Sequence, residues 1–354
     1  MKTKVIEVHP QYPELDTIAE CSKIIRDGGL VIFPTETVYG IACDYNNPKA
    51  MARLRKVKQR SDDKPFSVLL SQKGLIPNYT TLADPRLYKL INRFWPGPLT
   101  VVVPEKSGQG TIGVRVPNHP VAIRLVGDVK SRVAAPSANI EGRPAPTTCA
   151  EALKDLNGLV DIAIDSGAST VKLGSTVVDF TGMSPKVLRE GPITQAEIDR
   201  ETKKKTILFV CTGNSCRSVM AEYVLKSKVS GRMDVEVVSA GTGVFIQSRA
   251  SAETISVLKD EGINCLEHIS QPVSAILLKQ ADLIFVMTRG HRMQVLERVP
   301  EVEKRVYLLK EFSNTKETLQ GDLDVPDPIG RSNQDYKECL NVIKEAVNKI
   351  VELI

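Results

Sequence analysis

The sequence predicts an α/β protein with two domains. Short apolar segments typical of strands alternate along the chain with longer amphipathic segments typical of helices. With 354 residues the chain is longer than one globular core usually is, since a domain takes about 150 residues. The alternation lapses once, in the polar segment ITQAEIDRETKKKT that follows Gly191. We therefore expect one domain over residues 1–195, a linker over 196–205 and a second domain over 206–354.

The candidate elements follow one another in each half of the chain. In the first half they are, in order, GLVIFP, KAMARLRKVKQ, PFSVLL, RLYKLINRFW, LTVVVP and VAIRLV. In the second half the strand candidates are TILFV, VEVVSA, LIFVMT and RVYLL, separated by helical segments such as SAETISVLKDEG and HRMQVLERV. Short apolar strands that alternate with helices predict a doubly wound parallel sheet for this second half.

The C-terminal segment predicts an amphipathic helix that packs on the same sheet. Its apolar residues recur at spacings of three and four, which places them on one helical face. These residues are Tyr336, Leu340, Ile343, Val347, Ile350 and Ile354.

The composition is that of a folded protein in a reducing compartment. Hydrophobic residues make up 42% and charged residues 25% of the chain, and the formal charge of +5 permits nucleic acid or phosphate ligands without requiring them. Residues 1–10 lack the apolar core of a secretory signal, and no run approaches the roughly 18 apolar residues of a membrane span. The seven cysteines, an odd number, fit free thiols. We expect a cytoplasmic protein without a membrane partner.

A cysteine-based phosphate site is predicted directly after the strand TILFV. Cys211 is followed by Arg217 in a Cys-x5-Arg pattern, and a helix-like segment comes next. The N–H groups of such a loop and of the helix N-terminus converge on an anion, and Arg217 adds a bidentate donor. The same positive field favours the thiolate of Cys211, which can attack phosphorus. The remaining residues of the expected phosphate loop are Thr212, Gly213, Asn214, Ser215, Cys216 and Ser218, of which Asn214 and Ser218 are placed to bond the loop and the thiolate.

A carboxyl residue is needed beside this loop, because the leaving group must be protonated and a water molecule later activated. Asp327 in DVPDPIG is the candidate, since Pro326 and Pro328 indicate an ordered turn around it. Asp324 is the alternative. On its own a Cys-x5-Arg pattern would often mark only a buried thiol, and the strand-to-helix context and this turn favour catalysis.

Residues 205–354 resemble the low-molecular-weight protein phosphatase family. The resemblance includes CTGNSCRS and also SAGT at 239–242 and ADLIFVMT at 281–288. It implies phosphoprotein substrates, Cys211 as nucleophile, Arg217 as the phosphate and transition-state binder, and Asp327 as general acid and then base. It implies neither a metal nor a cofactor for this domain.

The sequence leaves two substrates open for this phosphatase, phosphoarginine and phosphotyrosine. The commonest tyrosine-specific pattern has a bulky aliphatic residue before the second loop cysteine and aromatic residues after the DP pair, whereas this chain has Ser215 and Ile329-Gly330. The small hydroxyl residue resembles the threonine of bacterial protein-arginine phosphatases and favours phosphoarginine over phosphotyrosine. Arsenate reduction would need resolving cysteines; Cys211 and Cys216 could pair, but Cys265 and Cys339 show no such spacing.

The first half carries no common nucleotide-binding motif. It lacks G-x-x-x-x-G-K-[ST], and its G-x-G-x-x-G at 108–113 precedes the strand-like VRVP where a dinucleotide-binding fold would have a helix. Six other strings occur in the order found in the YrdC/TsaC family of threonylcarbamoyl-adenylate synthases, which residues 10–195 resemble. They are FPTETVYG, KQRSDDKPF, FWPGPLT, VRVP, APSANIEGRPAPT, and GSTVVD with LREG.

This resemblance implies an α/β domain with a twisted mixed sheet and a synthase for tRNA modification. The substrates would be L-threonine, bicarbonate and ATP, with Mg²⁺ assisting at phosphorus, and the partners would be tRNA-modification proteins and tRNA. The implied ATP ligands are Lys58, Arg60, Thr111, Ser137, Asn139 and Arg189. On the threonine side the resemblance implies Thr35, Arg115, Ala135 and Ser175, with Ser175 also close to the nucleotide. One departure is that longer members often have histidine in the strand after the KxR motif, whereas PFSVLL has none.

Two alternatives stay open for the first half. Lys58 and Arg60 follow three other basic residues on one putative helix, so composition alone favours a solvated basic face. The half could then be an RNA-binding module without catalysis, beside a phosphatase that acts on phosphotyrosine. Aromatic residues are only 5% of the chain, and the absence of basic and aromatic interleaving argues against a stacking platform for RNA. Alternatively, one half could be a catalytically dead regulatory domain.

Overall fold

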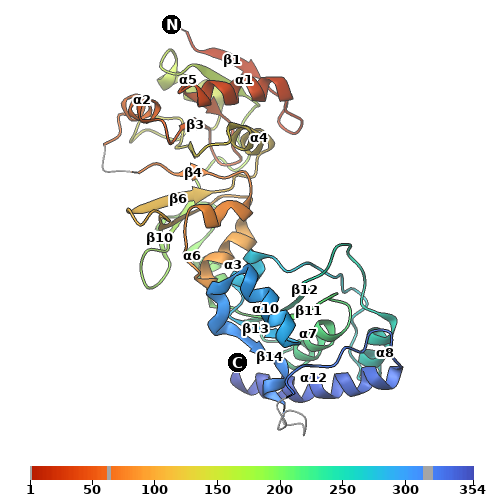
Figure 1. Cartoon of the computed structure of the whole chain (residues 1–354). Helices are drawn as coiled ribbons and strands as arrows, with labels where there is room; N and C mark the ends of the chain where they lie inside the picture. The colour runs from red at the N-terminus through yellow and green to blue at the C-terminus, as the bar shows by residue number, and fades with distance from the viewer. Residues whose placement is uncertain (1, 62–64, 314–321) are drawn as a thin grey trace. The chain divides into compact units, whose positions relative to one another are not determined.

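The computed structural model describes residues 2–61, 65–313 and 322–354 (Figure 1). The chain divides into two compact units, one made of residues 1–82 and 89–199, the other of residues 83–88 and 200–354. Residues 62–64 of the KQRSDDKPF motif lie outside the described residues. Among the helices of the described residues, none is both long enough and apolar enough to cross a membrane.

The first unit is built on a mixed sheet, which confirms the fold class expected for it. The strand order is β1-β8-β2-β3-β7-β4-β6-β5-β9-β10, with β1 parallel to β8 and β5 antiparallel to β6. The strands are β1 (Lys4–Glu7), β2 (Val31–Phe33), β3 (Gly40–Asp44), β4 (Val68–Leu69), β5 (Leu99–Pro104), β6 (Thr111–Arg115), β7 (Val133–Ala134), β8 (Ile162–Asp165), β9 (Thr176–Asp179) and β10 (Lys186–Arg189).

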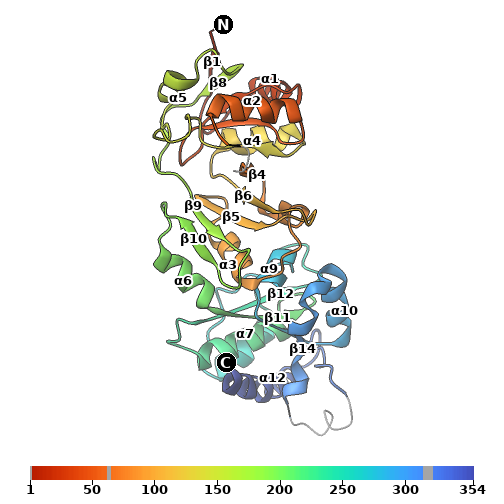
Figure 2. The same ribbon diagram turned by 90° about the vertical axis from the view of Figure 1, so that its left-hand side faces the viewer.

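Helices cover both faces of part of this sheet (Figure 2). One core places α1 and α4 against apolar residues such as Val31 and Ile162, and the other places α2 and α5 against Ile32 and Ala163. Neighbouring residues of a strand thus serve opposite cores, as the pleat requires. The helices and 3₁₀ turn are α1 (Leu15–Arg26), α2 (Pro48–Lys58), η1 (Lys73–Asn78), α4 (Pro120–Val129) and α5 (Cys149–Leu156), together with α3 (Pro85–Phe94), whose first residues are assigned to the second unit.

The segment expected to be a linker, residues 196–205, is mostly helical. Helix α6 (Gln195–Lys203) occupies it, and the first strand of the second unit starts at Lys205. Ile198 is buried, which gives this otherwise polar helix an anchor. A single buried apolar residue among charged neighbours makes a weak periodic signal, so the sequence pattern could not separate this helix from a loop.

The second unit has a four-stranded parallel sheet in the order β12-β11-β13-β14. All four strand candidates of the second half are confirmed, and the order reverses direction at β11, as in a doubly wound sheet. The strands are β11 (Lys205–Cys211), β12 (Val235–Gly241), β13 (Leu283–Val286) and β14 (Val306–Leu308).

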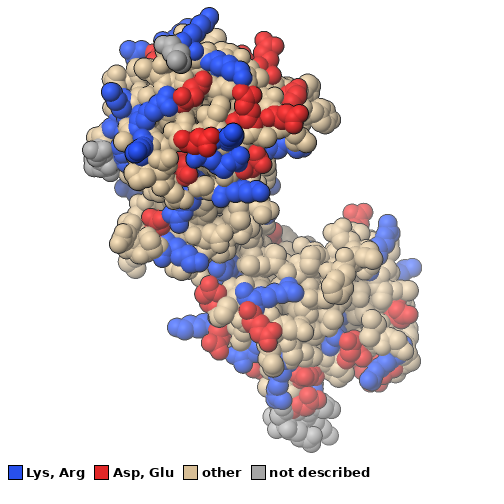
Figure 3. Space-filling model, turned by 45° about the horizontal axis from the view of Figure 1, so that its top comes forward, with Lys and Arg blue, Asp and Glu red and all other residues tan. Residues whose placement is uncertain are grey.

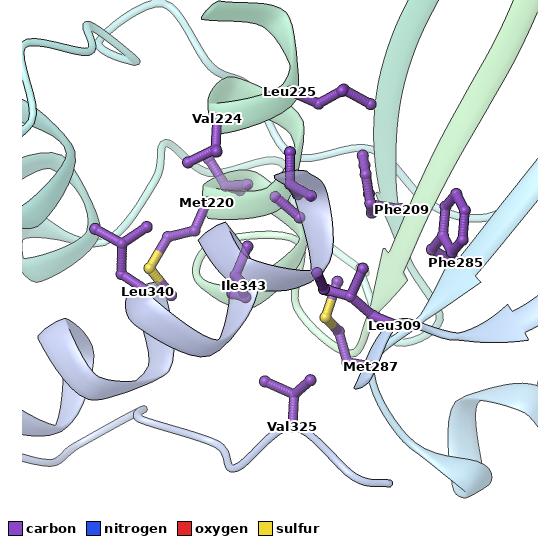
Figure 4. Packing of buried hydrophobic residues seen from close by; sticks show 14 of the residues in the cluster. Phe209, Met220, Val224, Leu225, Phe285, Met287, Leu309, Val325, Leu340 and Ile343 are labelled. Atoms are coloured by element: carbon purple, nitrogen blue, oxygen red, sulfur yellow. The ribbon is translucent and has the colours of Figure 1, made fainter. Parts of the chain in front are cut away.

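Helices lie on both faces of the parallel sheet. Phe209 and Phe285 point to the side of α7 and α12, where Met220, Leu340 and their neighbours fill the core shown in Figure 4. Leu208 and its neighbours pack on α9 and α10 on the other side. The helices and 3₁₀ turns are α7 (Arg217–Lys228), α8 (Ala252–Asp260), α9 (Ala275–Gln280), α10 (Arg289–Arg298), η2 (Pro300–Arg305), η3 (Leu309–Phe312) and α12 (Asn333–Leu353).

The predicted C-terminal helix is α12, and its apolar stripe is the buried face. Tyr336, Leu340 and Ile343 belong to the core of the second unit, as do Val347 and Ile350. Its N-terminus is fixed by Ser332, whose hydroxyl accepts from the N–H of Asp335 while the Asp335 carboxylate accepts from the N–H of Ser332.

Candidate active sites

A cavity of about 360 Å³ lies in the first unit, where the predicted synthase residues come together. Its walls come from residues of β4, β5, β6, β9 and β10 and from the segments 35–40 and 135–137. The predicted residues that line it are Thr35, Arg60, Thr111, Arg115, Ala135, Ser137, Ser175 and Arg189. Predicted residues as far apart in the sequence as Thr35 and Arg189 thus face one space.

Three guanidinium groups give this cavity its charge. The Arg60 guanidinium lies 5.0 Å from the centre of the Phe66 ring, a cation–π contact. Arg189 donates from Nε and Nη2 to the carbonyl oxygen of Ser175, at 3.0 and 2.8 Å. The pKa of Arg189 is lowered, first by desolvation and then by the like charge of Arg115. Nearby cations that already repel one another favour an anionic occupant.

Lys58 and Asn139, which the sequence analysis places among the ATP ligands, are not among the residues that line this cavity. The buried Lys58 ammonium donates to the carbonyl oxygens of Ser137 and Asn139, the latter at 2.7 Å. The Asn139 side chain accepts from the Ser137 hydroxyl at 2.6 Å and donates to the carbonyl of Arg143. Both residues therefore hold the Ser137 loop from behind.

The direction of Lys58 follows from the end of helix α2. This helix stops at Lys58, and Gln59 takes a left-handed φ of 52°, which turns the chain before Arg60. Arg60 reaches the cavity while Lys58 stays under the loop. Burial, followed by the like charge of Arg60, lowers the pKa of Lys58 to about 8.

Glu36 is a residue of this site that the sequence analysis missed. Its carboxylate Oε1 lies 2.7 Å from Nη2 of the cavity residue Arg115, and both side chains are only 8% exposed. Burying two charges costs desolvation free energy, which their mutual attraction offsets only when the two groups stay close together. The positions of Glu36 and Arg115 therefore depend on each other. The PTET string contained the signal, a glutamate between two threonines that follows the apolar segment GLVIFP.

The first unit offers no protein-built metal site within the described residues. No group of three or more His, Cys, Asp and Glu side chains in residues 2–61, 65–313 and 322–354 is arranged to hold an ion. The cavity walls, as far as the structure describes them, contain no carboxylate. The described residues of the cavity therefore offer Mg²⁺ no ligand set of their own.

The phosphate loop of the second unit wraps around Cys211 at the end of β11. The Cys211 sulfur lies 3.0 Å from the Ser218 hydroxyl and accepts from the N–H of Asn214 at 3.3 Å. The predicted contacts of Asn214 and Ser218 are both present, since Asn214 Nδ2 also donates to Ser218 Oγ at 3.0 Å. When Cys211 is a thiolate its sulfur can only accept, so the Asn214 N–H and the Ser218 hydroxyl can both donate to it.

Asn214 carries the tightest backbone turn of this loop, at a left-handed φ of 51°. Asparagine tolerates this conformation better than most residues, and three partners besides Cys211 and Ser218 hold it in place. Its side chain donates to Ser239 Oγ at 2.7 Å and accepts from the N–H of Gln271 at 2.9 Å. His268 Nε2 donates to the Asn214 carbonyl at 2.9 Å.

The SAGT string supplies the space for this loop. A Cβ atom on Gly241 would lie 2.3 Å from the carbonyl oxygen of Thr212 and 3.0 Å from the N–H nitrogen of Asn214. Only glycine permits the end of β12 to approach the loop this closely.

Arg217 begins helix α7 and is almost fully buried beneath the loop. Its Nη1 donates to the carbonyl of Val325 at 3.1 Å, and its Nη2 forms a short ion pair with Asp327 Oδ2. The Asp327 side chain is 44% exposed, so one carboxylate faces both the arginine and solvent. Asp324 instead accepts from the N–H of Arg289, which leaves Asp327 as the carboxylate on the arginine.

His291 is a second missed residue. It bridges the Thr212 hydroxyl, 2.8 Å from Nε2, and the Thr288 hydroxyl, 2.8 Å from Nδ1. Burial, followed by the charge of Arg217, lowers the pKa of His291 to about 4, so the imidazole is neutral near pH 7. It ties the phosphate loop to the start of α10, a contact between residues 79 positions apart.

Ser215 and Cys216 differ in their surroundings. The Ser215 side chain is half-buried. If Gly213 carried a Cβ atom, that atom would lie 3.4 Å from the Ser215 hydroxyl. Cys216 is buried, with the Tyr336 hydroxyl 3.5 Å and the Ser251 hydroxyl 3.6 Å from its sulfur. Ser215 is therefore partly accessible to solvent, whereas Cys216 packs toward Tyr336 of α12.

Two family models match the two units. The Sua5/YciO/YrdC model, described as telomere recombination, matches residues 23–191. The model described as low molecular weight phosphotyrosine protein phosphatase matches residues 206–354.

The curated relatives of this chain include threonylcarbamoyl-AMP synthases. Threonylcarbamoyl-AMP synthase of Pyrococcus abyssi is 35% identical over 246 residues, which cover 67% of this chain and 72% of the relative. Threonylcarbamoyl-AMP synthase of Bacillus subtilis is 33% identical over 211 residues, which cover 56% of this chain and 61% of the relative. The chain thus spans less than two thirds of the Bacillus protein.

Solved structures complete the comparison. The Pyrococcus abyssi Sua5 structure titled as complexed with L-threonine has a TM-score of 0.54 at 23% identity and covers 86% of this chain and 99% of that chain. YwlE arginine phosphatase from Geobacillus stearothermophilus has a TM-score of 0.38 at 34% identity, covering 42% and 92%. With the family models and curated relatives, the first unit makes this chain a member of the Sua5/YrdC family, joined to a low-molecular-weight phosphatase domain, and both families are enzymes.

Proposed function

We propose that the first unit forms L-threonylcarbamoyladenylate from L-threonine, bicarbonate and ATP. The threonine amine attacks bicarbonate, water leaves, and a carbamate results. A carbamate oxygen then attacks the α-phosphorus of ATP, and pyrophosphate departs. The adenylate would supply threonylcarbamoyl to tRNA adenosine with the help of tRNA-modification proteins.

One observation supports this reaction most strongly. A single cavity collects three guanidinium groups with the hydroxyls of Thr35, Ser137 and Ser175. A triphosphate, a carboxylate and a carbamate are all anions, and planar guanidinium donors suit each of them. In this proposal Mg²⁺ enters with ATP, bound to the phosphates, because the described lining contains no carboxylate. Relatives more than 30% identical carry the name threonylcarbamoyl-AMP synthase.

Pyrophosphate release tests the synthase directly. The purified full chain with ATP should release pyrophosphate only when threonine and bicarbonate are both present. Serine in place of threonine is a matched control that lacks one methyl group. Salt-sensitive RNA binding without turnover would favour the RNA-binding alternative instead. On the face shown in Figure 3, basic and acidic side chains are interspersed, which suits an extended RNA surface poorly.

Lys58 should give the ATP reaction a pH dependence. Below its pKa of about 8 the Lys58 ammonium adds positive charge behind the Ser137 loop, and above that pKa this charge is lost. We expect kcat/KM for ATP to fall about fivefold between about pH 7 and pH 9. Lys58→Met should start lower and stay flat over the same range. An equal fall in the variant would assign the titration to another group.

For the second unit we propose a phosphatase that works through a phosphocysteine. The Cys211 thiolate attacks phosphorus, the bond from phosphorus to the substrate breaks, and Asp327 gives its proton to the leaving atom. Water then attacks the phosphocysteine, Asp327 takes a proton, and phosphate and the thiolate are released. The donors on the Cys211 sulfur and the position of Asp327 against Arg217 support these roles.

Phosphoarginine is the substrate that we favour. Ser215 is small, polar and half-buried, and we expect it to leave room beside the loop for a planar phosphoguanidinium. Asp327 already pairs with one guanidinium, that of Arg217, and its exposed side can accept from a second. Phosphotyrosine is the alternative substrate. An exposed aromatic side chain that could contact a tyrosine ring is present in the same unit, that of Phe245, which follows the SAGT segment.

Ser215 variants separate the two substrates. Ser215→Ile should lower kcat/KM for a phosphoarginine peptide about thirtyfold or more relative to a phosphotyrosine peptide, because the branched side chain would fill the room beside the loop. Ser215→Thr, which keeps the hydroxyl, should retain the preference. A wild type that prefers phosphotyrosine would sink the assignment to phosphoarginine.

A further inference from the structure

We propose that Glu36 is a positioning residue, which holds the Arg115 guanidinium in the orientation that receives the carboxylate of the amino-acid substrate. The proposal rests on the proposed synthase function and adds a residue to it. Arg115 lines the cavity, whereas Glu36 does not. Glu36 would therefore act through Arg115 without touching the substrate.

The geometry fixes the guanidinium from two sides. Arg115 ends strand β6, and its Nε donates to the carbonyl of Gly97 at 3.1 Å. On the other side Glu36 Oε1 lies 2.7 Å from Nη2. The hydrogen bond to Gly97 and the ion pair with Glu36 hold two nitrogens of one planar group, which restrains the guanidinium for recognition of a carboxylate.

The pair is incomplete without a further partner. Arg115 Nη2 and both carboxylate oxygens of Glu36 are buried, and none of them has a hydrogen bond of good geometry to any described residue. The contact is thus an ion pair without directed bonds, and buried polar atoms in this state are costly. The lack concerns Nη2 alone, because Nε donates to the carbonyl of Gly97, and a ligand carboxylate that draws Nη2 toward the cavity would give this atom a directed partner.

The carboxylate of Glu36 also matters for the balance of charge around Arg115. Arg189 is close enough for its pKa to be lowered by the charge of Arg115. Glu36 offsets part of that repulsion. His119 also lies near Glu36, but burial lowers the pKa of this histidine despite the carboxylate, so it is neutral near pH 7. The negative charge of Glu36 is therefore available to Arg115.

The backbone of the same segment ties the site together. The carbonyl of Glu36 accepts from the N–H of Val171 at 2.8 Å, and the carbonyl of Thr35 accepts from the Ser169 hydroxyl at 2.8 Å. The segment held in this way leads directly into the cavity residues Gly174 and Ser175. Glu36 thus joins the arginine to the chain that carries Ser175.

The test measures steady-state kinetics of the full chain for threonine and for ATP separately. Glu36→Gln keeps the shape and removes the charge, so KM for threonine should rise about tenfold or more, while KM for ATP changes less than about twofold. Glu105→Gln is the matched control, because it breaks another ion pair of the same unit, that with Arg132, which lines no part of this cavity.

A double-mutant cycle with Arg115→Gln separates positioning from a general structural role. If Glu36 acts through Arg115, Glu36→Gln should have no further effect on KM for threonine once Arg115 is replaced. Additive effects, or equal rises in both KM values, would overturn the proposal. Should Glu36→Gln fail to fold, Glu36→Asp keeps the charge but shortens the reach, and an unchanged KM for threonine there would overturn it as well.

The same measurements distinguish a failure of the proposed synthase function from a failure of the proposed role of Glu36. A wild type that makes no threonylcarbamoyladenylate contradicts the proposed function and this inference together. An active wild type, with an unchanged KM for threonine in Glu36→Gln, contradicts the inference alone.

Discussion

Cys211→Ser is expected to lower phosphatase kcat by about 10⁴-fold or more. The serine hydroxyl is a far weaker nucleophile than a thiolate, and the donors on the sulfur, Asn214 N–H and the Ser218 hydroxyl, cannot generate an alkoxide near pH 7. The measurement is hydrolysis of a phosphopeptide under single-turnover conditions. A phosphocysteine trapped in the wild type should be missing from the variant.

Cys265→Ser is the matched control for this prediction. Cys265 is buried in the core of the same unit, and burial raises the pKa of its thiol, so it is expected to be inert. Phosphatase activity should therefore change less than about twofold. Residual activity of Cys211→Ser above about one hundredth of wild type would show that another group is the nucleophile.

Arg189→Gln is expected to lower kcat/KM for ATP by about 10²-fold in the synthase reaction. The substitution removes one of the three guanidinium charges of the cavity. It also removes the two hydrogen bonds that Arg189 donates to the Ser175 carbonyl. Charged hydrogen bonds contribute about 1.5 to 3 kcal/mol each, and about 1.4 kcal/mol corresponds to a tenfold change in rate. Pyrophosphate release at saturating threonine measures the effect.

Lys186→Gln controls for the loss of a positive charge on the same strand. Lys186 begins β10 and is exposed, and it does not line the cavity. Its replacement should leave kcat/KM for ATP within about twofold of wild type. A loss as large as that of Arg189→Gln would point to long-range attraction of ATP, and not to contact with the nucleotide.

The sequence predicted the phosphate loop well because its parts are local. Strand, loop and helix lie in one stretch from Lys205 to Lys228, so their spacing alone implies the geometry. Asp327 came from a turn more than 100 positions away, yet its two flanking prolines made that turn visible. The ion pair of Asp327 with Arg217 shows that the turn reaches the loop.

Features that depend on tertiary packing were not predictable in the same way. Lys58 and Arg60 are two residues apart in one basic segment, and only the left-handed turn at Gln59 sends them to opposite sides of the loop. The contact of Glu36 with Arg115 joins segments 79 positions apart, as does that of His291 with Thr212. Periodicity and spacing carry no information about such pairs, because the sheet order decides them.

The central claim is that one chain holds two separate active sites. The most direct test measures both activities, threonine- and bicarbonate-dependent pyrophosphate release and phosphopeptide hydrolysis, in wild type, Cys211→Ser and Arg189→Gln. The account predicts that each substitution removes one activity and leaves the other within about twofold of wild type. A wild type lacking either activity, or a single substitution that abolishes both, would contradict it.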